Sequence, residues 1–91
     1  MNKKHLKIKI HGKVQGVFFR DTTCKRAGEL GLSGWVRNES DGTVYIEIEG
    51  DPLKVDEFIR WCSKGPKMAK IDKIQSKEGQ IRGFSCFEVC Y

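Results

Sequence analysis

The order in which strand and helix patterns follow one another constrains the fold of this chain more than any other feature. Apolar and polar residues alternate over residues 6–11 and 44–49, which is typical of strands with one buried face. Residues 35–38 predict a further short strand, joined to 44–49 by the turn residues 39–42. The patterns run strand, helix, strand, strand, helix, strand. This order predicts an α+β fold of the split βαβ (βαββαβ) kind, an antiparallel sheet with two helices packed on one face.

Capping residues set the expected helix boundaries. The first helix is expected to begin at Asp21 or Thr22, whose side chain would accept from free N–H groups, and to stop at residues 30–32. The second helix is expected to begin at Asp51, before a proline, and to end at residues 65–66. The N-terminus of the first helix would then point its N–H groups at the segment before it.

The last third of the chain has a less regular pattern. Residues 71–74 indicate a fourth strand, although their isoleucines are not spaced by two. Residues 76–83 are polar and predict a turn, and residues 87–91 alternate as in a last strand. The pattern leaves open whether these two strand segments are separate members of the sheet.

The length and charge of the chain restrict its number of domains and its possible partners. Its 91 residues are enough for one modest core, so residues 1–91 are expected to form a single domain. The 17 Lys and Arg residues against 12 Asp and Glu give a net charge of +5, which favours anionic partners. No apolar stretch approaches the roughly 20 residues of a membrane span, and no signal peptide is expected. We therefore expect a cytoplasmic monomer without a membrane partner.

The four cysteines do not form a metal-binding pattern. Cys24, Cys62, Cys86 and Cys90 contain no C-x-x-C pair, so no metal site is expected. Cys86 and Cys90 on one strand would lie about 13 Å apart, too far for a disulfide. We expect Cys24 and Cys62 to be buried packing residues and the other two to line a strand face.

A glycine-bracketed run separates the first strand from the first helix. Residues 12–20 read Gly-Lys-Val-Gln-Gly-Val-Phe-Phe-Arg. Gly12 and Gly16 permit positive φ, which lets successive backbone N–H groups turn towards one point. Arg20 adds a planar guanidinium that matches phosphate oxygens in a bidentate manner. The run therefore predicts a binding site for a phosphate or a carboxylate.

The same run carries a resemblance to a known family. Residues 14–20 are similar to the acylphosphatase signature, in which Val-Gln-Gly-Val is followed by one variable residue, here Phe18, and by Phe-Arg. A second signature of that family is present in residues 34–38, followed by 42–44 and Gly50. The resemblance to the acylphosphatase family extends over nearly the whole chain.

The resemblance implies a ferredoxin-like fold with a short additional strand. It also implies an enzyme, an acylphosphatase that hydrolyses the carboxyl-phosphate bond of acyl phosphates without a metal or a cofactor, and it makes Asn38 the second catalytic residue beside Arg20. A water held by the Asn38 amide would attack phosphorus in line. Inorganic phosphate would be a product or an inhibitor. The residues expected to bind the phosphoryl oxygens through their backbone amides are Gln15, Gly16, Val17, Phe18 and Phe19.

Several residues near this run have more than one interpretation. Phe18 and Phe19 are adjacent, so one ring is expected in the core and the other at the rim of the loop. His11 is expected to be an exposed strand residue and not a general base, and Asp21 a helix cap and not a phosphoryl acceptor. The resemblance further implies that the carboxylate of Tyr91, the last residue, orients Arg20.

One alternative remains from another functional class. A basic split βαβ domain is also the scaffold of an RNA-recognition module, and residues 82–87 faintly resemble the aromatic motif of that module. The motif belongs on the third strand of the sheet, whereas here it enters the last one. We therefore expect no nucleic-acid partner, and a non-catalytic phosphate- or nucleic-acid-binding module is the second interpretation. The sequence does not identify which acyl or carbamoyl phosphate is the natural substrate.

Overall fold

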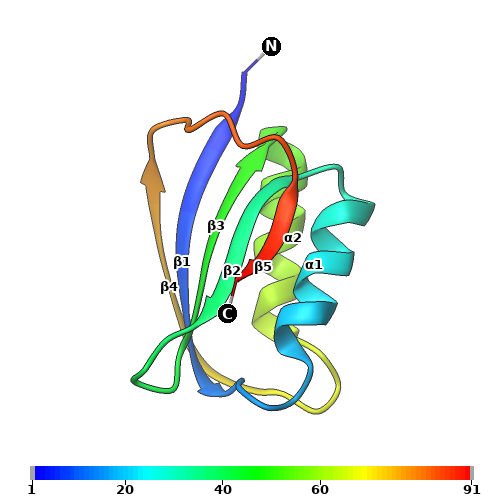
Figure 1. The fold of residues 1–91 in the computed structure, drawn as a ribbon. Helices are drawn as coiled ribbons and strands as arrows, with labels where there is room; N and C mark the ends of the chain where they lie inside the picture. Colours follow the sequence, from blue (N-terminus) through cyan, green and yellow to red (C-terminus); the bar gives the residue numbers. More distant parts are fainter. Residues whose placement is uncertain (1, 91) are drawn as a thin grey trace.

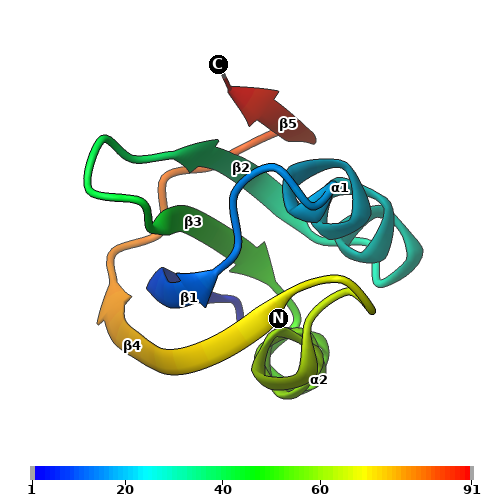
Figure 2. The same ribbon diagram turned by 90° about the horizontal axis from the view of Figure 1, so that it is seen from below.

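The computed structural model describes residues 2–90, which form two layers, a sheet and a pair of helices (Figure 1). The elements are β1 (Lys4–Lys13), α1 (Phe19–Glu29), β2 (Ser33–Asn38), β3 (Val44–Gly50), α2 (Pro52–Lys64), β4 (Lys70–Gly79) and β5 (Phe87–Cys90). The strand order is β4-β1-β3-β2-β5, and both helices cover the same face of the sheet (Figure 2). This arrangement confirms the split βαβ prediction.

The sheet differs from the prediction at one edge. The pairs β1–β3, β1–β4 and β2–β3 are antiparallel, but β5 runs parallel to β2, with Gly34 opposite Phe87. The expectation of a purely antiparallel sheet is therefore wrong, and the sheet is mixed. The cause is the path of residues 80–86, which cross the end of the sheet from β4 to the far edge, so that β5 enters beside the start of β2 (Figure 1).

The fourth strand is longer than its pattern indicates. Residues 76–79 were expected in a turn, but they continue β4 and pair with β1 as far as the His5–Gly79 partners. That part of the prediction is wrong because the free edge of β1 offers hydrogen-bonding groups that decide where β4 ends. The polar composition of residues 76–79 reflects an edge strand, which is exposed along most of its length.

The alternating apolar residues of the strands form the core beneath the helices. Opposing residues such as Ile8 and Ile46 lie on the same face of β1 and β3, and both are fully buried. Burying one such side chain contributes about 1.5–3 kcal/mol to folding. The helices complete the core with the buried side chains of Phe19, Ala27, Val55, Phe58 and Cys62.

The second helix begins and ends close to where its capping residues predict. Asp51 is the N-cap, and its carboxylate accepts a hydrogen bond of 2.8 Å from the Leu53 N–H. The helix ends at Lys64, and Gly65 follows with φ of 68°. The local sequence is sufficient to predict these helix boundaries, because the capping residue, the proline and the glycine each affect only the backbone next to them.

The first helix begins earlier than expected. Its N-cap is Phe18, no side chain caps it, and the helix starts at Phe19. The prediction of a cap at Asp21 or Thr22 is wrong, and the Thr22 hydroxyl instead donates back to the Phe18 carbonyl at 2.8 Å. Burial of the Phe19 ring in the core draws the helix start towards the loop. As a result Arg20 lies in the first helical turn.

The cysteines fit their predicted places only in part. All four are free, and Cys62 is buried as expected, which raises the pKa of its thiol well above the ordinary value. Cys24 is only half-buried beside β5, where its Sγ lies 3.8 Å from the Phe87 carbonyl oxygen, and Cys86 is exposed and precedes β5. Those two expectations are wrong.

Neither α1 nor α2 is long and apolar enough to cross a membrane, and residues 2–90 hold no other α-helix.

The face of the sheet opposite the helices holds a buried cluster of titratable side chains. His5 is 1% exposed and lies between two carboxylates of β3, with Nδ1 2.8 Å from Glu49 and Nε2 3.0 Å from Glu47. Both ring nitrogens of His5 therefore lie within hydrogen-bonding distance of an acidic side chain of β3.

Glu49 also anchors the segment that leads to β5. Its carboxylate accepts hydrogen bonds from the backbone N–H groups of Arg82, Gly83 (3.0 Å) and Phe84 (3.1 Å), and the Phe84 ring lies 5.8 Å from that of His5. Burial alone would raise the pKa of Glu49, but the N–H groups and the His5 ring outweigh it, so that its pKa is lowered. Residues that resemble an RNA-binding motif thus use their backbone to hold Glu49.

Candidate active site

Two glycines turn the chain from β1 into the loop that precedes α1. The pairing of β1 with β4 shifts register between His11 and Gly12, and Gly12 has φ of 132°. A Cβ atom at this position would collide with the Lys70 carbonyl oxygen of β4. Gly16 has φ of 74° at the tip of the loop. The sequence therefore places glycine where no other residue fits this path without strain.

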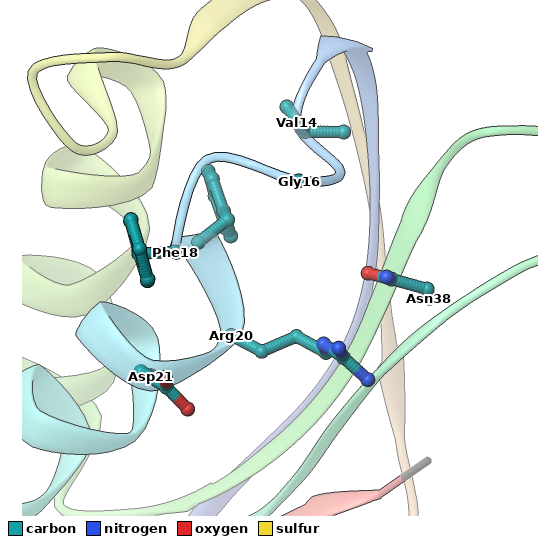
Figure 3. A pocket seen from close by; sticks show the side chains of 7 residues that line it. Val14, Gly16, Phe18, Arg20, Asp21 and Asn38 are labelled. Atoms are coloured by element: carbon teal, nitrogen blue, oxygen red, sulfur yellow. The ribbon is translucent and has the colours of Figure 1, made fainter.

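The loop borders a pocket of about 270 Å³ between the start of α1 and the end of β2 (Figure 3). Of the residues predicted to form the site, Gly16, Phe18, Phe19, Arg20 and Asn38 line it. Val14 and Asp21 also line the pocket, although the sequence did not identify them. Two segments that are separate in the sequence, residues 14–21 and Asn38, therefore meet at one opening.

Arg20 extends into this pocket from the first turn of α1, towards the strand that carries Asn38 (Figure 3). Its Nη1 donates a hydrogen bond of 3.3 Å to the backbone carbonyl of Cys90 in β5. The last strand thus helps to orient the guanidinium. The predicted role of the Tyr91 carboxylate lies outside the described residues and stays a prediction.

Asn38 is the last residue of β2 and faces the pocket from the opposite side (Figure 3). Its Oδ1 is buried and, among residues 2–90, has no hydrogen-bond partner. An unsatisfied buried acceptor costs about 1–3 kcal/mol, and most buried polar atoms are paired with protein or with ordered water. The role of Asn38 in holding a water stays a prediction.

The Gln15 side chain ties the loop to the hairpin that follows Asn38. Its Nε2 donates to the carbonyl oxygens of Glu39 at 2.7 Å and Thr43 at 2.9 Å. The hairpin is closed by Asp41, which accepts from the Thr43 hydroxyl at 2.6 Å and pairs with Lys9 at 2.9 Å. These contacts hold the pKa of Asp41 well below its ordinary range, and the hydrogen bond from the Thr43 hydroxyl has the largest effect.

Sequence and structure comparisons identify the family to which this site belongs. A sequence profile described as acylphosphatase matches residues 6–89. The chain is 47% identical over 85 residues to an acylphosphatase of Rubrobacter xylanophilus, with 89% of this chain and 77% of that protein covered. The chain belongs to the acylphosphatase family. It is therefore a hydrolase, and its substrates are acyl phosphates.

Solved acylphosphatase structures share the whole fold. The structure of an acylphosphatase from Coxiella burnetii superposes with a TM-score of 0.94 at 35% identity and covers 98% of this chain and 94% of that one. The acylphosphatase from Bacillus subtilis gives a TM-score of 0.94 at 31% identity, with 97% and 99% covered. The additional strand β5 is thus part of an acylphosphatase fold.

Within this acylphosphatase fold, the predicted loop residues take different places. Phe19 is 1% exposed and packs beside Trp61, whereas Phe18 is 78% exposed, which confirms that the two rings diverge. Val17 is buried, and neither it nor Gln15 lines the pocket. The side chain of Gln15 could not be placed from the sequence, because its partners are backbone atoms of a distant hairpin.

The other titratable residues near the loop are also placed. His11 lies outside the pocket lining, half-buried on β1, and its Nε2 is 2.8 Å from the Gln75 side-chain oxygen. Asp21 lines the pocket from the first turn of α1, one residue after Arg20 (Figure 3). A carboxylate in the first turn of a helix interacts favourably with the helix dipole.

Proposed function

We propose that this acylphosphatase hydrolyses its substrates by direct in-line attack of a water on phosphorus, with Arg20 and the loop amides holding the phosphoryl group and Asn38 holding the water. The observation that carries the proposal is the pocket itself. The guanidinium of Arg20 and the unpaired Oδ1 of Asn38 enter it from opposite walls, beside a loop bent by positive-φ glycines.

The phosphoryl group requires hydrogen-bond donors that are in position before charge redistributes in the transition state. Arg20 supplies two N–H groups in one plane, and the contact of its Nη1 with Cys90 reduces the freedom of the side chain. The start of α1 at Phe19 places helix N–H groups and the positive end of the helix dipole beside the loop. Preorganised donors of this kind stabilise a transition state because they need no rearrangement.

The water requires an acceptor that fixes its direction. The Asn38 Oδ1 is an acceptor without a partner among residues 2–90, and an amide cannot remove a proton at neutral pH. Asn38 therefore acts by positioning the water. The leaving group is a carboxylate, which is a weak base, so that departure requires little help from an acid.

Hydrolysis of acetyl phosphate in the presence of a chelator tests the proposal. We expect the wild type to turn over and Arg20→Ala to lose activity while it keeps its melting temperature. Arg26→Ala is a matched control, since Arg26 lies on the same helix and pairs with Glu29 and Glu57 away from the pocket. Equal turnover in Arg20→Ala and Arg26→Ala would refute the role of Arg20. Phosphate binding without turnover in the wild type would instead identify a binding module.

A further inference from the structure

One large apolar side chain is exposed at the edge of the pocket. Phe18 is 78% exposed, and it lines the pocket together with Arg20 and Asn38. The other exposed large apolar side chains in residues 2–90 lie outside the lining, namely Leu53, Met68 and Ile81. A single exposed leucine or methionine is common on a protein surface, but an apolar ring beside a polar pocket is a binding feature.

The backbone conformation at residue 18 does not favour phenylalanine. Its φ of 59° and ψ of 24° are left-handed, and it is the only residue other than glycine with positive φ in the described chain. Glycine or asparagine takes this conformation at a lower steric cost than phenylalanine. Because the ring is exposed, core packing does not repay that cost, and strained residues of this kind concentrate at functional sites.

The lining of the pocket has a polar part and an apolar part. Arg20 and Asn38 supply the polar part, where the phosphoryl group binds under the proposed function. Val14 and Phe19 are apolar but only 1% exposed each, so they offer a ligand little surface. Phe18 is therefore the main apolar surface available to the part of a substrate that projects from the phosphoryl site.

We propose that Phe18 forms a subsite for the acyl group, and that the enzyme prefers acyl phosphates with an aromatic acyl group over those with a small one. The inference rests on the proposed function, since it takes the phosphoryl end to be held at Arg20. An aromatic acyl group stacks on the phenyl ring, whereas an acetyl group is too small to cover it.

The test compares kcat/KM for benzoyl phosphate and acetyl phosphate. Phe18→Asn removes the ring and suits the left-handed backbone, and Phe18→Tyr keeps the ring. We expect Phe18→Asn to lower kcat/KM for benzoyl phosphate about threefold to tenfold, the range that an aromatic contact supplies. The ratio of kcat/KM for benzoyl phosphate to kcat/KM for acetyl phosphate should therefore fall in Phe18→Asn, because an acetyl group does not cover the ring that is lost. Phe18→Tyr should keep the wild-type ratio.

Leu53→Asn is the matched control, because Leu53 is 77% exposed but lies outside the pocket lining. It should leave the ratio of the two kcat/KM values unchanged. Equal changes for both substrates in Phe18→Asn, or no change for either, would overturn the acyl subsite while leaving the proposed hydrolysis intact. Failure of the wild type to hydrolyse either substrate would overturn the proposed function and the subsite with it.

Discussion

The substitution Glu49→Gln removes one charge from the buried cluster beneath residues 80–86, and its effect on stability can be estimated. One oxygen of Glu49 accepts from Gly83 and Phe84, and the other from His5 and Arg82. A glutamine keeps one acceptor oxygen, so that two of these donors face an NH₂ group. Each buried donor left unpaired costs about 1–3 kcal/mol, so two of them cost about 2–6 kcal/mol.

We therefore expect Glu49→Gln to lower the free energy of unfolding by about 2–6 kcal/mol. A domain of this length has a total of about 5–14 kcal/mol, so the loss is a large part of its stability. Urea denaturation followed by tryptophan fluorescence measures the change. The matched control is Glu78→Gln, on the exposed edge strand β4, which should change the free energy by less than about 0.5 kcal/mol. A loss below about 1 kcal/mol in Glu49→Gln would refute the estimate.

The same cluster gives the protein a defined response to acid. The pKa of Glu49 is lower in the folded chain than its ordinary value of 4.5, so the unfolded chain binds a proton first as the pH falls. The stabilisation is complete above pH 4.5 and is lost as the pH falls through the lower, folded pKa. Denaturation at a series of pH values should show this loss in the wild type and a smaller loss in Glu49→Gln.

Three further predictions concern the site. Arg20→Lys should lower kcat/KM for acetyl phosphate on the order of 10²–10³-fold, because a point charge cannot replace the planar fork, and steady-state kinetics measure this loss. Asn38→Ala should lower kcat far more than it changes the inhibition constant of phosphate, and near-normal turnover would disprove water positioning. Gln15→Glu should lower kcat and the melting temperature, because a carboxylate would face the carbonyls of Glu39 and Thr43, whereas Gln75→Glu, at an exposed residue, should change neither.

The parts of the fold that the sequence predicts are those decided by near neighbours. The bounds of α2 follow from Asp51 and Gly65, and the bend of the loop follows from Gly12 and Gly16. The start of α1 cannot be predicted in this way, because no neighbouring residue indicates that Phe18 adopts a left-handed conformation. The direction of β5 and the length of β4 depend on which strand edge is free, which is a property of the assembled sheet.

The candidate site shows the same division. The loop and Arg20 are evident from glycine spacing and residue type, whereas the partners of the Gln15 side chain are backbone atoms of the distant hairpin. The cluster of His5 and Glu49 is hidden from the alternating pattern, which places both residues on the polar face of their strands. Residues 82–84 fold over Glu49 and donate backbone hydrogen bonds to it, a contact that the pattern does not show.

The hydrogen bond from Arg20 to Cys90 also sets the order in which the site becomes complete during synthesis. The loop and α1 leave the ribosome early, whereas β5 leaves it after every other element. A nascent chain therefore displays the loop of residues 12–20 before the carbonyl that accepts from Arg20 is available. Chains that have not yet exposed residue 90 carry the loop without this contact to the guanidinium.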